Sequence, residues 1–333
     1  MPRLLDHPAA DRPLLSLLES QLEEVALVIE RQLASDLPAV NALCRHVERY
    51  RGKMLRPTMV LLSGLASVGA EDAAALTPAH RTVAAVTELI HMATLVHDDV
   101  LDDAAERRRG ATVNALHGNE MAVMLGDYLI SNAFHLCSSV GDPAINLALG
   151  RVTNTLCEGE LLQLHHRNHY GIDEATYFEI VKRKTASLIA EACRLGAMLC
   201  GAPPHVAEAL AEAGTALGIA FQIQDDLLDL VGDQQVVGKS LGRDLDKGKL
   251  TLPLILHLGE ASPVERGEAL RSIEQRDHQS LTGLLLAGGA IARATDRANE
   301  FVSRAKRRLA ALPAGPARDL FDSLADRLVM RPF

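Results

Sequence analysis

Aromatic side chains are scarce in this 333-residue chain. Phe, Tyr and Trp together make up 3% of it, and Trp is absent, although 48% of the residues are hydrophobic. A core of sufficient size must therefore be built from Leu, Ala, Val and Ile. Such a composition favours helices over strands.

Three further absences narrow the class of protein. The net charge of −9 gives no general excess of positive charge, which argues against a nucleic-acid-binding surface. No apolar run approaches the roughly 18 residues that a membrane span needs, and the first residues lack the pattern of a signal peptide. The five cysteines include no CxxC pair, as is typical of buried thiols in a reducing cytosol. We expect a cytoplasmic protein with no nucleic-acid partner and no stable membrane span.

Apolar residues recur at helical spacing along nearly the whole chain, whereas the alternating pattern of strands is absent. The breaks between the periodic segments are short and rich in Gly and Pro. Predicted helices cover residues 14–34, 38–50, 58–69, 78–105, 119–138, 143–166, 173–201, 203–231, 251–258, 262–276, 279–289, 291–311 and 314–330. With no interdomain linker, residues 1–333 are predicted to form a single all-α domain with long central helices.

An acidic cluster follows the apolar part of the predicted helix 78–105. Asp98 and Asp102 lie one turn apart on a helix, with Asp99 and Asp103 beside them. Carboxylates grouped next to buried residues repel one another unless cations neutralise them. Ligands that are all oxygen suit Mg²⁺, which normally keeps several waters. The alternative is an acidic helix end that faces water.

A second copy of the motif makes that alternative less attractive. Asp225, Asp226 and Asp229 repeat the DDxxD spacing, again at the end of a strongly apolar helical run. Two such clusters, each following a buried helix, are difficult to explain as solvated faces. The sequence therefore predicts six metal-site carboxylates: Asp98, Asp99, Asp102, Asp225, Asp226 and Asp229.

Several motifs, in order, resemble those of the trans-type isoprenyl diphosphate synthases, the polyprenyl synthetase family, and most closely its long-chain, octaprenyl-type members. The matching segments are RGKMLRP (51–57), LVHDDVLDDAAERRRGATVN (95–114), LGD (125–127), CEGELLQ (157–163), KT (184–185), FQIQDDLLD (221–229) and GKSLGRDLDKGKLTLP (238–253). The resemblance covers roughly residues 45 to 260. It implies an isoprenoid synthase fold, in which a single-domain bundle of long helices surrounds a central cavity.

The resemblance also implies the reaction. Such enzymes condense isopentenyl diphosphate with an allylic diphosphate, and Mg²⁺, about three ions per active site, neutralises the charge that develops on the leaving diphosphate. An allylic cation forms, the double bond of isopentenyl diphosphate attacks it, and the departing diphosphate takes the proton. A homodimer is expected.

The family match assigns roles to the basic and polar residues. Asp98, Asp99, Asp102 and Asp225 would hold the metal, with Asp226 and Asp229 assisting partly through metal-bound water. The predicted substrate-binding groups are Arg107, Lys184 and Lys239 for the allylic diphosphate, Lys53, Arg56, His91 and Arg108 for isopentenyl diphosphate, and Lys249 at the edge of the site. Thr185 and Gln222 would place oxygen dipoles near the carbocation. Glu158 and Gln163 match a helix that faces the cavity, although a packing role explains them equally well.

Product length is predicted from the side chains one turn before the first aspartate. Ala93 and Thr94 are small there, and a bulky aromatic would close the channel about one turn (~5.4 Å) below the metal. The open channel predicts a long product of roughly six or more isoprene units. Met124 and Phe134 on a neighbouring helix are candidates for its floor, although packing of an apolar helix also explains them.

The sequence departs from the family at two positions and leaves alternatives open. Arg109 stands where the family usually has Gly, and Met54 replaces a basic residue. His165, His166 and His169 are better explained as a polar helix end than as a zinc site. The alternative functions are a geranylgeranyl or farnesylgeranyl diphosphate synthase, a non-catalytic subunit of a heteromeric synthase, a class I terpene cyclase and a di-metal helical oxidase. Both intact aspartate motifs argue against the subunit, and Lys53, Arg56 and His91 argue against the cyclase.

Overall fold

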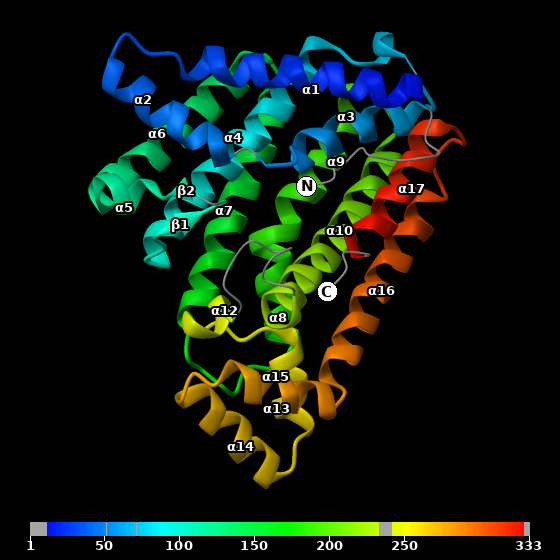
Figure 1. Cartoon of the computed structure of the whole chain (residues 1–333). Helices are drawn as coiled ribbons and strands as arrows, with labels where there is room; N and C mark the ends of the chain where they lie inside the picture. The colour runs from blue at the N-terminus through cyan, green and yellow to red at the C-terminus, as the bar shows by residue number, and fades with distance from the viewer. Residues whose placement is uncertain (1–11, 51, 71, 109, 233–241, 330–333) are drawn as a thin grey trace. The chain divides into compact units, whose positions relative to one another are not determined.

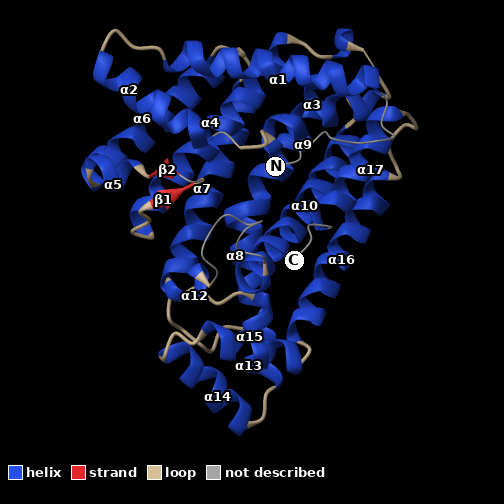
Figure 2. Ribbon diagram, in the orientation of Figure 1, coloured by secondary structure: helices blue, strands red, loops and turns tan. Residues whose placement is uncertain are grey.

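Helices account for nearly all of the regular structure, as the composition predicts (Figure 2). The computed structural model describes residues 12–50, 52–70, 72–108, 110–232 and 242–329. The longer helices are α1 (Arg12–Leu33), α2 (Pro38–Val47), α3 (Leu55–Val68), α4 (Pro78–Leu101), α6 (Asn119–Ser138), α7 (Pro143–His165), α8 (Glu174–Val181), α9 (Ser187–Leu199), α10 (Pro204–Val231), α13 (Leu252–Glu260), α14 (Pro263–Glu274), α15 (His278–Ala287), α16 (Ala290–Leu309) and α17 (Pro316–Val329). The short elements are η1 (Glu48–Tyr50), η2 (Ala73–Ala75), α5 (Val113–His117), η3 (Lys182–Ala186) and α12 (Arg243–Asp246).

The chain leaves the predicted helix 78–105 earlier than expected. Helix α4 ends at Leu101, and Asp102, the C-cap residue, has φ −97° and ψ 0°. A two-stranded antiparallel hairpin follows, in which β1 (Glu106–Arg107) pairs with β2 (Gly110–Ala111). The sequence does not predict these strands, because two residues are too few to show an alternating pattern. Arg108, in the turn between them, has φ 50°, which is uncommon for a residue other than Gly.

The described residues fall into two compact units. The first contains the chain up to Thr153 together with Leu188–Gly214 and Arg308–Leu324. Within it, α4 packs against α1, α3 and α6 (Figure 1), and the stretch of α4 from Val83 to Ile90 is entirely buried. This rigid helix therefore positions the first aspartate motif at its C-terminal end.

The second unit contains Asn154–Ser187, Thr215–Arg307 and the described residues from Ala325 onward. Its core is an apolar cluster contributed by α8, α10, α13, α14, α15 and α16, which includes Tyr177, Ile223, Leu227, Leu254 and Ala294. The C-terminal part of α10 carries the second aspartate motif. The two motifs thus lie at equivalent places on helices that differ in their surroundings.

One helix within the described ranges, α10, is long and apolar enough by composition to cross a membrane. The window that passes this test is 61% buried inside the protein. Core helices of soluble proteins pass the same test, so this finding is weak evidence for a membrane span.

Candidate active site

The three aspartates of the first motif differ in their exposure to solvent. Asp98 and Asp102 are partly exposed at the end of α4, where the backbone N–H of Asp102 donates to the carbonyl of Asp98 at 2.9 Å. Asp99, between them, is 1% exposed. The motif therefore offers two carboxylates to its surroundings and directs the third into the protein.

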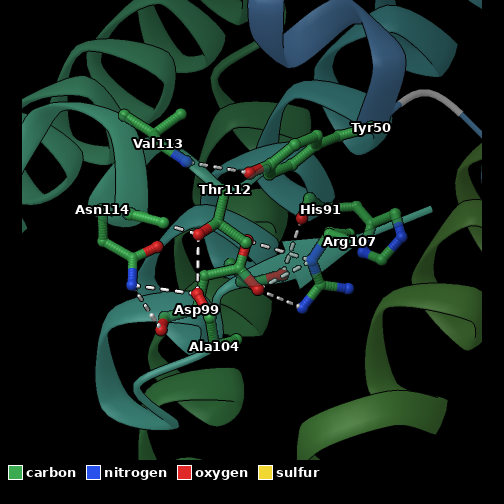
Figure 3. A network of polar contacts seen from close by, with 10 residues as sticks. Tyr50, His91, Asp99, Ala104, Arg107, Thr112, Val113 and Asn114 are labelled. Atoms are coloured by element: carbon green, nitrogen blue, oxygen red, sulfur yellow. Dashed lines mark hydrogen bonds and ion pairs between the residues drawn. The ribbon is translucent and has the colours of Figure 1, made fainter. Parts of the chain in front are cut away.

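Arg107 on β1 occupies both oxygens of Asp99. Its Nε donates to Oδ1 at 2.9 Å and to Oδ2 at 3.0 Å, and its Nη2 lies 2.8 Å from Oδ1 (Figure 3). Burial raises the pKa of Asp99, and Arg107 opposes that rise. In the structure Asp99 and Arg107 form a buried ion pair, which fixes where the hairpin leaves α4. The metal-ligand role predicted for Asp99 and the diphosphate-binding role predicted for Arg107 stay predictions.

Tyr50 and Asn114, which follows the hairpin, complete this arrangement (Figure 3). The guanidinium carbon of Arg107 lies 5.8 Å from the centroid of the Tyr50 ring, a cation–π contact. Burial and then the charge of Asp99 raise the pKa of Tyr50 to about 12. Asn114 donates to the carbonyls of Asp99 and Ala104 at 3.2 and 3.1 Å. The end of α4 is thus held on several sides.

Arg56, His91 and Arg108 form a second group of the first unit, and they influence one another strongly. Burial lowers the pKa of Arg56 to about 10, while the charge of Glu88 opposes this shift and the charge of Arg108 adds to it. Burial lowers the pKa of His91 well below its usual value, and the charges of Arg56, Arg108 and Arg107 act in the same direction. His91 is therefore neutral, and the three guanidiniums form a concentration of positive charge.

Glu88 is the buried acid that faces this group. It is 2% exposed and lies one turn before His91 on α4. Burial lowers the pKa of both Arg56 and Arg108, and the charge of Glu88 opposes that shift. Asp99 already pairs with Arg107, and the single carboxylate of Glu88 cannot balance both Arg56 and Arg108, so the group suits an added anion. The Arg108 guanidinium also approaches Gly52 so closely that a Cβ there would overlap it, and it donates to the carbonyl of Tyr50. Lys53 is exposed beside Gly52.

In the second unit, Asp226 is buried between two neutral donors. The Tyr177 hydroxyl donates to its Oδ2 at 2.7 Å, and Gln222 Nε2 donates to its Oδ1 at 2.8 Å. Burial and then the charge of Asp244 raise the pKa of Asp226 well above its usual value, while the two hydrogen bonds lower it. Thr185 Oγ1 donates to Gln222 Oε1 at 2.8 Å. Predicted residues 185, 222 and 226 therefore belong to one hydrogen-bonded chain.

Asp229 binds the backbone that follows the second motif. Its Oδ2 accepts from the N–H of Asp244 at 3.1 Å, and its carbonyl accepts from the N–H of Gly242 at 2.8 Å. Asp225 is partly exposed. Lys249 is half-buried and its N–H donates to the carbonyl of Asp244 at 2.9 Å. The predicted ligand Lys239 lies outside the described residues.

Lys184 and Thr185 lie in a single π-helical turn, Lys182–Ala186, between α8 and α9. Such turns are frequent at functional sites. A Cβ on Gly159 of α7 would lie 2.6 Å from the backbone nitrogen of Lys184, and one on Gly218 of α10 would lie 2.6 Å from the Ala186 Cα. The wide turn therefore fits because both neighbours are glycines. Its lysine donates to Gln163 Oε1 at 2.9 Å and pairs with Glu160, whereas Glu158 pairs with Arg183.

The predicted chain-length residues lie in different surroundings. Ala93 is fully buried, and half-buried Thr94 donates to the carbonyl of His91 at 2.8 Å. Met124 is 63% exposed on α6, and Phe134 is half-buried there. Their role in setting product length stays a prediction.

The histidines near the end of α7 stack on one another. The His166 and His169 rings lie 5.7 Å apart and nearly parallel, and His165 meets His166 edge-on at 5.0 Å. Within the described part of the chain, no three His, Cys, Asp or Glu side chains are grouped so that they could hold a metal ion by themselves.

Sequence reasoning missed several residues that hold the predicted ones in place. They are Tyr50, Glu88, Glu160, Tyr177 and Asp244. Glu88 carried a usable signal, because a charged residue inside an otherwise apolar helical stretch is rarely buried without a partner. Tyr177 carried none, since a tyrosine in an apolar helix normally indicates core packing.

Comparison with known proteins identifies the family of this chain. The family model for polyprenyl synthetase matches residues 38–283, well over half of the chain. The chain belongs to the polyprenyl synthetase family. Octaprenyl diphosphate synthase of Escherichia coli (strain K12) is 36% identical over 311 residues, covering 92% of this chain and 94% of that protein.

Two solved structures extend the similarity to the whole family fold. The polyprenyl synthase from Caulobacter crescentus CB15, complexed with calcium and isoprenyl diphosphate, has a TM-score of 0.88 at 33% identity and covers 98% of this chain and 99% of its own. Decaprenyl diphosphate synthase from Rhodobacter capsulatus has a TM-score of 0.87 at 34% identity, with 95% and 97% covered. The predicted all-α isoprenoid synthase fold and the predicted enzyme class, a long-chain trans-prenyltransferase, are thereby confirmed.

Proposed function

We propose that this polyprenyl synthetase extends an allylic diphosphate with isopentenyl diphosphate, in a Mg²⁺-dependent reaction, to a long all-trans polyprenyl diphosphate. The observation that carries the proposal is the positive charge of Arg56 and Arg108 next to neutral His91 on α4, the helix whose C-terminal end carries Asp98 and Asp102. Concentrated positive charge beside partly exposed carboxylates suits a diphosphate bound together with divalent cations.

The donor set of the first motif fits Mg²⁺. Asp98 and Asp102 are carboxylates one turn apart, and Mg²⁺ usually takes one or two protein carboxylates and completes its shell with water and substrate phosphates. Asp99 is committed to Arg107, so we assign it to positioning the motif. When bound, the metal supplies charge neutralisation on the leaving diphosphate. About three ions per active site is the stoichiometry we propose.

Each basic group then has a role that follows from its surroundings. Arg56 and Arg108 bind the diphosphate of isopentenyl diphosphate, with Lys53 at the exposed edge, and neutral His91 contributes a hydrogen bond rather than charge. Lys184, aimed by Glu160 and Gln163, binds the allylic diphosphate, as do Lys239 and, at the margin, Lys249. Thr185 and Gln222 direct oxygen dipoles at the allylic cation.

We further propose that residues 1–333 act as one domain in a cytoplasmic homodimer. The family model runs across both compact units, which supports one functional domain. Several large apolar side chains are exposed on the adjoining helices α5 and α6 of the first unit, which supports a partner surface: Leu116, Met121, Val123 and Met124. Sedimentation of the purified protein at two concentrations tests the dimer, and a monomer at both would refute it.

Turnover of the purified protein with isopentenyl diphosphate, farnesyl diphosphate and Mg²⁺ tests the function. We expect a ladder of products of six or more units, measured by mass, that disappears with EDTA and in Asp98→Ala. Products that stop at four or five units would favour the shorter-chain alternative. Folded protein without any elongation would favour the non-catalytic subunit.

Ala93→Phe tests the origin of the long product. The buried Ala93 lies about one helical turn before Asp98, so an aromatic ring there should shorten the product by several isoprene units while turnover persists. Ala93→Ser is the control, because it stays small, and its products should match those of the unchanged protein. Equal product lengths in Ala93→Phe would place the floor elsewhere.

A further inference from the structure

Tyr177 stands at one end of a hydrogen-bonded chain that ends at a predicted catalytic residue. Its hydroxyl donates to Asp226 Oδ2 at 2.7 Å, Gln222 Nε2 donates to Asp226 Oδ1 at 2.8 Å, and Thr185 Oγ1 donates to Gln222 Oε1 at 2.8 Å. The four residues come from three segments, namely α8, α10 and the π-helical turn. Their order therefore depends on tertiary packing.

The chemistry of the groups sets the direction of every bond in the chain. Tyr177 donates its hydroxyl proton to Asp226 Oδ2, and Gln222 turns its amide nitrogen, which can only donate, toward Asp226 Oδ1. The amide oxygen of Gln222 then points at Thr185 and accepts the hydroxyl proton. As a result the Thr185 oxygen keeps its lone pairs for another neighbour.

Tyr177 is the fixed end of the chain. Its side chain is 4% exposed, belongs to the apolar cluster of the second unit and meets the Phe178 ring at 5.4 Å. Asp226 is also 4% exposed. Because both groups are buried, leaving either of them without a hydrogen bond would cost free energy. This cost favours the bond between them.

We propose that Tyr177 is a positioning residue, which acts through Asp226 and Gln222 to hold the Thr185 hydroxyl with its lone pairs, not its proton, available to the substrate. An oxygen lone pair stabilises an electron-poor allylic carbon, whereas a hydroxyl proton would instead bind a diphosphate oxygen. The inference rests on the proposed function, since it names how that reaction's polar residues are oriented.

A double-mutant cycle with Tyr177→Phe and Asp226→Asn tests the proposal. Tyr177→Phe removes one hydrogen bond to a carboxylate, so we expect kcat to fall about 10- to 100-fold, with KM for isopentenyl diphosphate within about twofold. In the Asp226→Asn background the same change should lower kcat less than about threefold. A tyrosine that only packs would cost the same factor in both backgrounds, and that result would overturn the proposal.

Two further variants serve as controls for misfolding and for nonspecific effects of removing a hydroxyl. Tyr170→Phe removes a hydroxyl from another tyrosine packed against the same cluster and should leave kcat unchanged. Thr185→Val gives a second cycle, in which Tyr177→Phe should add less than about threefold to the loss. Additive losses there would also overturn the proposal.

Urea unfolding provides a readout that does not depend on turnover. If Tyr177 and Asp226 are coupled, the unfolding midpoint of the double variant should lie above the value expected from adding the two single shifts. Additive midpoints would contradict the Tyr177–Asp226 bond. If the variants show this coupling but the unchanged protein makes no product, the proposed function is refuted and the Tyr177–Asp226 bond is still supported.

Discussion

The two DDxxD motifs place their middle aspartates in the same kind of position but neutralise them differently. Asp99 and Asp226 are 1% and 4% exposed, while the flanking aspartates of both motifs are partly exposed. Asp99 is held by the guanidinium of Arg107. Asp226 is held by two uncharged donors, Tyr177 and Gln222.

This difference shows that a repeated motif does not imply repeated chemistry. In both motifs the middle aspartate anchors the helix end, whereas the outer members are more exposed to solvent. In the first unit the anchor is an ion pair that consumes one cation of a strongly basic group. In the second, the anchor is a neutral network that orients Gln222 and Thr185. The surroundings, not the spacing, decide what each aspartate does.

Replacing each middle aspartate by its amide tests whether the two motifs hold it differently. Asp99→Asn should lower the free energy of unfolding by about 3 kcal/mol or more, because it leaves the partly buried Arg107 without its counter-charge. Asp226→Asn should change it by less than about 1 kcal/mol, because both partners of Asp226 are uncharged and no charge is left without a counter-charge. Urea unfolding at neutral pH measures both.

Asp98→Asn is the matched control for this pair of variants. It replaces a partly exposed neighbour on the same helix end and should abolish elongation with little effect on stability. Equal destabilisation by the Asp99 and Asp226 variants would show that the two anchors are equivalent after all.

Low pH should destabilise the first unit through its buried histidines. Burial lowers the pKa of His80 to about 4, against an ordinary value near 6.5. The unfolded chain therefore binds a proton below about pH 6.5 that the native protein binds only near pH 4. Stability is constant above this window and falls as the pH drops through it, by about 3 kcal/mol.

His80→Gln should reduce this loss, as measured by unfolding at pH 7 and pH 4.5. Glutamine can still accept from the N–H of Thr77 and donate to the carbonyl of Gly196, as His80 does, but it does not titrate. The loss of stability between pH 7 and pH 4.5, and so the slope of stability against pH, should become smaller without vanishing, because the pKa of His91 is also lowered. His117→Gln, at an exposed position, should retain the full slope. An unchanged slope in His80→Gln would assign the acid sensitivity elsewhere.

The wide turn of the second unit predicts a smaller effect on stability. Gly159→Ala places a Cβ 2.6 Å from the Lys184 nitrogen, and such overpacking costs about 1–3 kcal/mol. Gly150→Ala on the same helix is the control, because nothing lies within 4 Å of its Cβ. It should stabilise the helix by about 0.5–1 kcal/mol. Stabilisation by both substitutions would show that the π-helical turn tolerates a side chain at residue 159.

Much of the fold could be predicted because helical periodicity is a local property of the sequence. The long helices, including α4 and α10, lie within a few residues of the predicted ranges. The hairpin after α4 could not be predicted, since its existence depends on Arg107 reaching back to Asp99 and on Asn114 binding two carbonyls. These contacts join residues 8 to 15 positions apart without any periodic signal.

The same reasoning explains which site residues could be found. The motifs identified the aspartates, and Thr185 with Gln222, by their residue types and order. They gave no reason to separate Asp99 from Asp98, because adjacent aspartates look alike until burial distinguishes them. Tyr177, Glu160 and Glu88 act on predicted residues from other turns or other helices, so only the packed structure could place them.

We expect the smallest effect when an exposed arginine–carboxylate pair is removed and the result is compared with the loss of the buried pair. Arg183 pairs with Glu158, whose side chain is 59% exposed, and with Glu179, whose side chain is 42% exposed. Because water screens such pairs, Glu158→Gln should change the free energy of unfolding by less than about 0.5 kcal/mol, and added salt should remove the difference. Urea unfolding at low and high salt measures it against Asp99→Asn. A salt-independent loss comparable to that of Asp99→Asn would mean that burial does not set the strength of these pairs.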